Sequence, residues 1–128
     1  MRIGLKQPLA ISIDDASGGL VVENNTIAEI VPMGGSPSAP VDQVVDMSQH
    51  VILPGLINTH HHFYQTLTRA VPEALNKELF PWLKSLYPIW AGLDDHMIHV
   101  ATKLACAELL LSGCTTAADH HYLFPEGV

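Results

Sequence analysis

The stretch that decides the fold is VILPGLINTHHHFYQ, residues 51–65, in which a short apolar run leads into three consecutive histidines. Side chains of an extended chain point alternately to its two faces. An extended segment over residues 56–62 would therefore place His60 and His62 on one face and His61 on the other. Two neutral imidazoles spaced in this way can bind one metal ion through their ring nitrogens. The sequence predicts a metal half-site at His60 and His62, with a pair of solvated loop histidines as the alternative.

A second strand is expected after a helix. Asp94 is a suitable N-cap for an amphipathic helix that runs to Leu111, and Gly113 suits the position just beyond its end. Residues 114–119 then form an apolar strand. Parallel strands joined through a helix make a βαβ unit, so the segment from Leu56 to Asp119 is predicted to be one.

The connection between the first strand and this helix, residues 63–93, is expected to contain helical pieces. Pro81 suits the first position of one of them. The side chains of Trp82, Leu83 and Leu86 would then share one face of that helix. This face is predicted to be apolar and packed.

The residues before the histidine stretch predict a small antiparallel sheet. Residues 9–14 alternate between apolar and polar side chains, as a half-buried strand does. Residues 20–23 and 26–31 flank Asn24-Asn25, and because asparagine tolerates positive φ, this pattern predicts a β-hairpin. A further strand is expected within residues 41–47.

The motif PGLINTHHH, residues 54–62, resembles the first-strand metal motif of the amidohydrolase superfamily, and Asn58-Thr59 before the first histidine resembles its aminohydrolase branch. The stretches at residues 64–88 and 112–125 are similar to purine deaminases of that branch, which have triazine hydrolases as relatives. The resemblance implies an α/β fold, the N-terminal portion of a (β/α)8 TIM barrel preceded by part of a small antiparallel β-sandwich. The implied boundaries are 1–55 and 56–128. A whole barrel needs roughly 200 to more than 400 residues, so the chain is expected to be an N-terminal fragment of an enzyme.

The resemblance also implies an activity and a cofactor. The full-length enzyme would use one divalent metal ion, with zinc expected and iron as an alternative, to deaminate a purine-like heterocycle. The most specific expectation is conversion of 8-oxoguanine into urate and ammonia. The alternatives are a hydrolase of triazines or other heterocycles, and a truncated fragment without activity. Relatives take further ligands and proton-transfer groups from later strands, so His60 and His62 are the catalytic machinery expected in this chain.

Three residues are expected to contact the substrate. Gln65 follows the second ligand by three positions, as does a purine-binding glutamine in guanine-type deaminases, and its amide can both donate and accept hydrogen bonds. Trp82 could stack on a planar heterocycle or could simply fill the core. His121 belongs to the group Asp119-His120-His121, of which at least one member should face the pocket. Arg69 could be structural or could bind substrate.

Composition narrows the class of partner. The formal net charge is −7 with six Lys and Arg in total, so nucleic acid is not an expected partner. No signal-peptide h-region and no membrane-length apolar run are found, which predicts a cytoplasmic protein without membrane contact. Cys106 and Cys114 form no Cys-x-x-Cys pair and are expected to be buried small residues. The expected partners are a small purine-like substrate and, for the full-length enzyme, copies of itself in a homo-oligomer.

Overall fold

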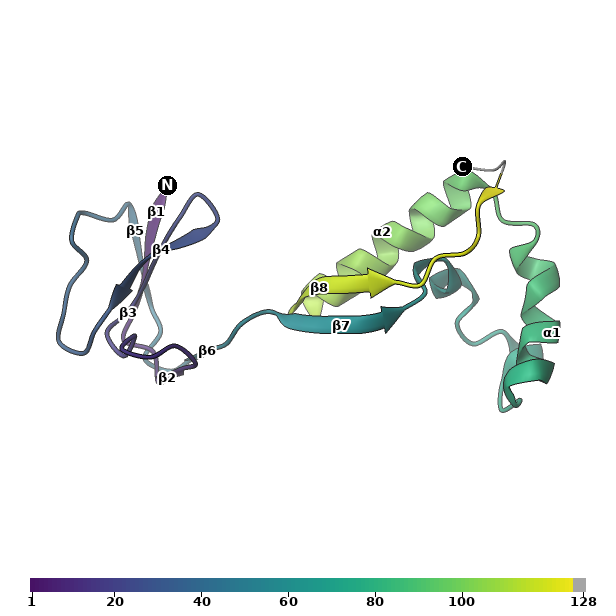
Figure 1. Cartoon of the computed structure of the whole chain (residues 1–128), viewed down its shortest axis with the longest axis horizontal. Helices are drawn as coiled ribbons and strands as arrows, with labels where there is room; N and C mark the ends of the chain where they lie inside the picture. The colour runs from purple at the N-terminus through teal and green to yellow at the C-terminus, as the bar shows by residue number, and fades with distance from the viewer. Residues whose placement is uncertain (126–128) are drawn as a thin grey trace. The chain divides into compact units, whose positions relative to one another are not determined.

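The computed structural model describes residues 1–125 and separates into two compact units, one ending at Pro54 and the other beginning at Gly55 (Figure 1). Within the described residues, the first unit contains a four-stranded and a two-stranded sheet, and the second unit contains a two-stranded sheet. The division into a sandwich subdomain, 1–55, and a barrel segment, 56–128, concerns the complete fold and stays a prediction.

The first unit is built on a four-stranded mixed sheet. Its strands are β1 (Arg2–Lys6), β3 (Gly19–Glu23), β4 (Thr26–Val31) and β5 (Gln43–Asp46), in the order β4-β3-β1-β5. The prediction of a purely antiparallel sheet is wrong at one edge, where β5 runs parallel to β1. The long loop over residues 32–42 returns the chain to the end where β1 begins, and the Asp42 N–H donates to the Arg2 carbonyl there. A strand that starts at the same end must run in the same direction.

The predicted hairpin is confirmed. Asn24 and Asn25 have φ values of 48° and 66°, the left-handed conformation that a tight two-residue turn between twisted strands requires. The strand expected over residues 9–14 is shorter in the structure, where β2 covers only Ala10–Ile11. It pairs in parallel with β6 (Val51–Ile52). Sequence reasoning missed β1, whose signal was the alternation of polar residues with Ile3 and Leu5.

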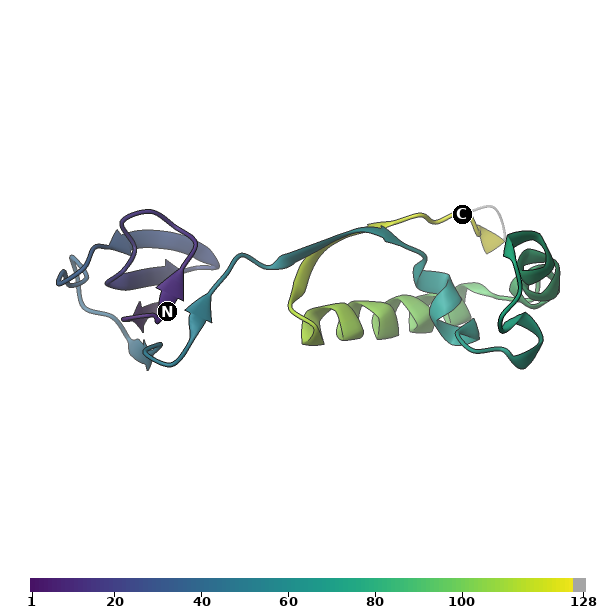
Figure 2. The same cartoon turned by 90° about the horizontal axis from the view of Figure 1, so that it is seen from below.

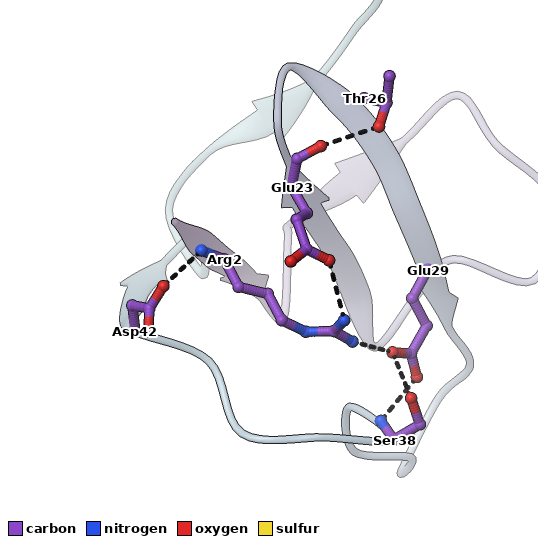
Figure 3. A network of polar contacts seen from close by, with 6 residues as sticks. All are labelled: Arg2, Glu23, Thr26, Glu29, Ser38 and Asp42. Carbon is purple, nitrogen blue, oxygen red and sulfur yellow. Dashed lines mark hydrogen bonds and ion pairs between the residues drawn. The ribbon is translucent and has the colours of Figure 1, made fainter.

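A polar network fastens the long loop to this sheet (Figure 3). The Arg2 guanidinium bonds to Glu23 at 3.2 Å and to Glu29 at 2.8 Å. The backbone N–H and the hydroxyl of Ser38 both donate to Glu29, at 2.8 and 2.9 Å. These Ser38 bonds, followed by Arg2, lower the pKa of the Glu29 carboxyl. The loop over 32–42 is therefore tied to the face of β4.

The second unit contains the predicted βαβ arrangement. Its elements are β7 (Leu56–His61), the 3₁₀ helices η1 (Phe63–Thr68) and η2 (Pro72–Ala74), α1 (Leu79–Trp90), α2 (Asp95–Leu111) and β8 (Cys114–Asp119). β7 and β8 pair in parallel, as predicted, and α2 runs along one face of the pair in both views (Figures 1 and 2). The fold is thus mixed α/β. Within residues 1–125 the parallel sheet has two strands and does not close into a barrel.

Local signals set the helix ends. The Asp94 carboxylate accepts the Met97 N–H at 2.7 Å, which confirms the predicted N-cap of α2. Gly113, with φ of 83°, follows the C-cap as predicted. Pro81 was expected at the first position of its helix, but α1 begins at Leu79 and Pro81 is its third residue. The backbone nitrogens of the first turn have no partner within the helix, so proline is tolerated there as well.

The core of the second unit lies between η1, η2 and α1. Tyr64, Ala74, Leu86 and Trp90 are buried together, and Trp82 and Leu83 pack against them, which confirms the predicted apolar face. The Trp90 indole N–H donates to the Thr68 hydroxyl at 3.0 Å. Cys114 is buried as expected. The expectation of a buried Cys106 is wrong, because this residue of α2 lines an open hollow beside β8. No helix in residues 1–125 is long and apolar enough to span a membrane.

Candidate metal and substrate site

The two predicted metal ligands face each other. His60 is the second-to-last residue of β7, and His62 directly follows the strand. Their Nε2 atoms are 3.1 Å apart. His61 points elsewhere, with its ring against Phe63 at a centroid distance of 4.9 Å. The alternation predicted from the sequence therefore holds at the end of the strand.

The separation of the two nitrogens fits a shared metal ion. Ring nitrogens 3.1 Å apart are close enough to bind one ion through Zn–N bonds of about 2.05 Å. Two imidazole lone pairs at this distance also need a proton or a cation between them. The described residues offer no group of three or more metal-binding side chains, so His60 and His62 would form only half of a metal site.

The protonation of His62 follows from its backbone partner. Its Nδ1 lies 2.9 Å from the carbonyl oxygen of His120. Since a carbonyl can only accept, Nδ1 carries the hydrogen, and this tautomer leaves Nε2 free to present a lone pair toward His60. A second hydrogen bond of this kind is what orients most metal-binding histidines. Sequence reasoning gave His120 no role of its own, and only the pairing of β7 with β8 shows it.

Gln65 lies beside the histidines. Its backbone N–H donates to the His62 carbonyl at 3.0 Å, which places it in the first turn of η1. A hollow of about 240 Å³ is lined by His60, His61, His62, Gln65, Thr66 and Arg69. The Gln65 amide nitrogen donates to the hydroxyl of buried Tyr64 at 3.1 Å. Burial raises the pKa of Tyr64, and Tyr122 adds to the rise, so this hydroxyl stays neutral.

Trp82 does not line the hollow of the histidines. It lines a second hollow of about 200 Å³ together with Gln65 and Arg69, which line both hollows. The Trp82 ring also packs edge-to-face on Trp90, at 5.5 Å between centroids. Both roles considered for Trp82, core filling and a wall near the site, are compatible with this position.

The residues at the end of β8 divide between two tasks. The Asp119 carboxylate accepts the Phe63 N–H at 2.9 Å, the role of holding a loop amide. His121 pairs with Asp119 at 3.4 Å and packs against Tyr64 and Phe124, outside the lining of the histidine hollow. A substrate contact by His121 stays a prediction.

Arg69 has a structural partner. Its guanidinium makes a two-pronged contact with the Glu108 carboxylate of α2, with one Nη1–Oε1 distance of 3.2 Å. Hydrogen bonding to Arg69 lowers the pKa of Glu108. This pair ties η1 to α2 at the rim of the hollow.

A histidine pair at the C-terminal end of one parallel strand, braced by the next strand, is an arrangement that suits one half of a metal site. Residues 51–126 match the Amidohydrolase family, and the chain belongs to this family. It is 58% identical to the 8-oxoguanine deaminase of Pseudomonas aeruginosa over 130 residues, which cover 99% of this chain and 29% of that protein. It is 39% identical over 95 residues to a hydroxydechloroatrazine ethylaminohydrolase of a Pseudomonas strain, covering 73% of this chain and 20% of that protein.

The structure is similar to that of a variant atrazine chlorohydrolase from Arthrobacter aurescens complexed with zinc and atraton. The TM-score is 0.78 with 26% identity, covering 96% of this chain and 29% of that one. The chain thus spans less than a third of the length of each of these relatives.

Proposed function

We propose that the full-length protein carrying this segment is a metal-dependent aminohydrolase that converts 8-oxoguanine and water into urate and ammonia. The observation that carries the proposal is the His60–His62 pair, whose Nε2 atoms lie 3.1 Å apart beside an amide side chain. The 58% identity to an 8-oxoguanine deaminase supports the choice of substrate.

His60 and His62 would hold one divalent metal ion, with zinc expected and iron as the alternative. When bound, such an ion makes water acidic enough to act as the hydrolytic nucleophile near neutral pH. We propose that the remaining ligands come from later strands of a (β/α)8 barrel, of which β7 and β8 would be the first two. The relatives' greater length is consistent with this proposal.

Gln65 would recognise the ring. One hydrogen of its amide is used by Tyr64, which leaves the second N–H and the carbonyl oxygen for a substrate. A purine lactam presents an adjacent acceptor and donor, so one amide can bind both. We propose the indole of Trp82 and the imidazole of His121 as further substrate contacts. A homo-oligomeric state is likewise part of the proposal.

Hydrolysis of a substituted triazine is the second candidate. The similarity to an atrazine chlorohydrolase structure favours it, because a first-strand histidine pair serves either reaction. The identities to the two triazine-acting relatives, 26% and 39%, are lower than the 58% identity to the purine deaminase, which favours the purine.

The test is a substrate panel on the full-length, metal-loaded protein. Urate formation is followed by absorbance and ammonia release by a coupled assay, with 8-oxoguanine, guanine and isocytosine compared with chloro- and alkylamino-triazines. We expect 8-oxoguanine to have the highest kcat/KM. Faster turnover of a triazine would transfer the assignment to the second candidate. If a metal-loaded protein shows neither activity, both candidate functions are wrong.

A further inference from the structure

Two residues at the end of β8 form hydrogen bonds with the backbone on either side of His62. The Asp119 carboxylate accepts the N–H of Phe63, the residue after His62, at 2.9 Å. The His120 N–H donates to the carbonyl of His61, the residue before it, at 2.7 Å. The backbone of His62 is therefore fixed between two bonds to another strand, even though β7 itself ends at His61.

His120 also reaches the imidazole rings. The His120 carbonyl accepts from Nδ1 of His62, and the His120 ring stacks on His60 with 4.4 Å between centroids and 25° between planes. His120 directly follows Asp119, the last residue of β8. Both imidazoles of the half-site are therefore in contact with His120, directly after β8.

The second oxygen of Asp119 is also engaged. Oδ2 lies 3.4 Å from Nδ1 of His121, and both side chains are about three-quarters buried, with 22% and 26% of their surface exposed. This pairing holds the carboxylate in the orientation in which Oδ1 faces the Phe63 N–H. A freely solvated strand-end aspartate would have no such second contact.

We propose that Asp119 is a positioning residue for the metal half-site, which fixes His62 in the tautomer and orientation that present Nε2 toward His60. The proposal rests on the function proposed above, because it concerns the two expected metal ligands. Partners that orient metal-binding histidines typically change metal affinity about 10- to 100-fold when they are removed.

The experiment compares Asp119→Ala and Asp119→Asn in the full-length protein. The asparagine oxygen can still accept the Phe63 N–H, so Asp119→Asn is the conservative rescue. Asp94→Ala is the matched control, because it removes an equivalent bond from an aspartate to a backbone N–H, at the start of α2 and away from the histidines. Should Asp119→Ala fail to fold, Asp119→Ser replaces it, since its hydroxyl is one bond too short to reach the Phe63 N–H.

Two readouts are taken. Zinc affinity is measured by chelator competition, and the histidine tautomers of the metal-free protein are measured by ¹⁵N NMR. We expect Asp119→Ala to lower zinc affinity about 10- to 100-fold and to give His62 mixed tautomers, while Asp119→Asn and Asp94→Ala resemble the wild type.

Wild-type zinc affinity and a single His62 tautomer in Asp119→Ala would overturn the proposal. An equal loss of affinity in Asp94→Ala would also overturn it, because general destabilisation would then explain the effect. If the wild type binds no zinc, the proposed function fails. The tautomer comparison needs no metal and still decides whether Asp119 positions His62.

Discussion

Tyr64→Phe tests how the side-chain amide of Gln65, the proposed substrate contact, is held in place. Tyr64 is fully buried, and its hydroxyl accepts a hydrogen bond from the Gln65 amide at 3.1 Å. Burial raises the pKa of the hydroxyl, so it stays neutral near neutral pH. Phenylalanine keeps the ring that packs on Trp90 and removes only the oxygen. The substitution therefore frees Gln65 without opening a cavity in the core.

The expected magnitude follows from one neutral hydrogen bond. Such a bond contributes about 0.5–1.5 kcal/mol, which corresponds to a roughly 2- to 13-fold loss in kcat/KM if the whole contribution is used to orient Gln65. Zinc content should not change, because Tyr64 makes no hydrogen bond to His60 or His62. Tyr87→Phe is the matched control, since Tyr87 lies half-exposed on α1.

The assay is steady-state kinetics of the full-length enzyme with 8-oxoguanine, run as a double-mutant cycle with Gln65→Ala. Gln65→Ala alone should retain zinc and lose at least as much kcat/KM as Tyr64→Phe. If Tyr64 acts through Gln65, adding Tyr64→Phe to Gln65→Ala should cost almost nothing further.

Two results would refute the reasoning. Fully additive losses would show that Tyr64 affects the reaction by a route other than Gln65. A Tyr64→Phe enzyme that loses zinc would show that the hydroxyl supports the histidine pair instead.

Further outcomes are expected. His62→Ala in the full-length protein should abolish zinc binding and turnover, and stoichiometric zinc in the variant by elemental analysis would exclude it as a ligand. Glu108 has a pKa lowered by Arg69, so the pair stabilises the fold above the ordinary Glu pKa of about 4.3 and loses this contribution as pH falls through the lowered value. The change in urea midpoint between about pH 6 and about pH 3.5 should therefore be smaller in Glu108→Gln than in the wild type. The difference between the two proteins should be small, because the pair is exposed. The isolated 128-residue chain should aggregate, because Leu56 and Ile57 of β7 are 58% and 69% exposed; a cooperative thermal transition of a soluble monomer would contradict this.

Features with a local physical cause could be predicted from the sequence. The Asn24-Asn25 turn needs two residues that tolerate positive φ, and the N-cap at Asp94 needs an oxygen three residues before a free N–H. The opposite faces of His60 and His61 follow from the pleat of an extended chain. Each of these depends on neighbours within a few positions, which the sequence displays directly.

Only the tertiary structure decided the features that join distant parts of the chain. The parallel direction of β5 depends on where a long loop returns beside Arg2, and the sequence contains no signal for that end. The tautomer of His62 depends on the carbonyl of His120, which lies 58 residues away. A backbone carbonyl is the same in every residue, so its partner is chosen by the register of β7 with β8. The sequence by itself therefore determined which side chains could bind a metal ion, and strand pairing determined how those side chains are held.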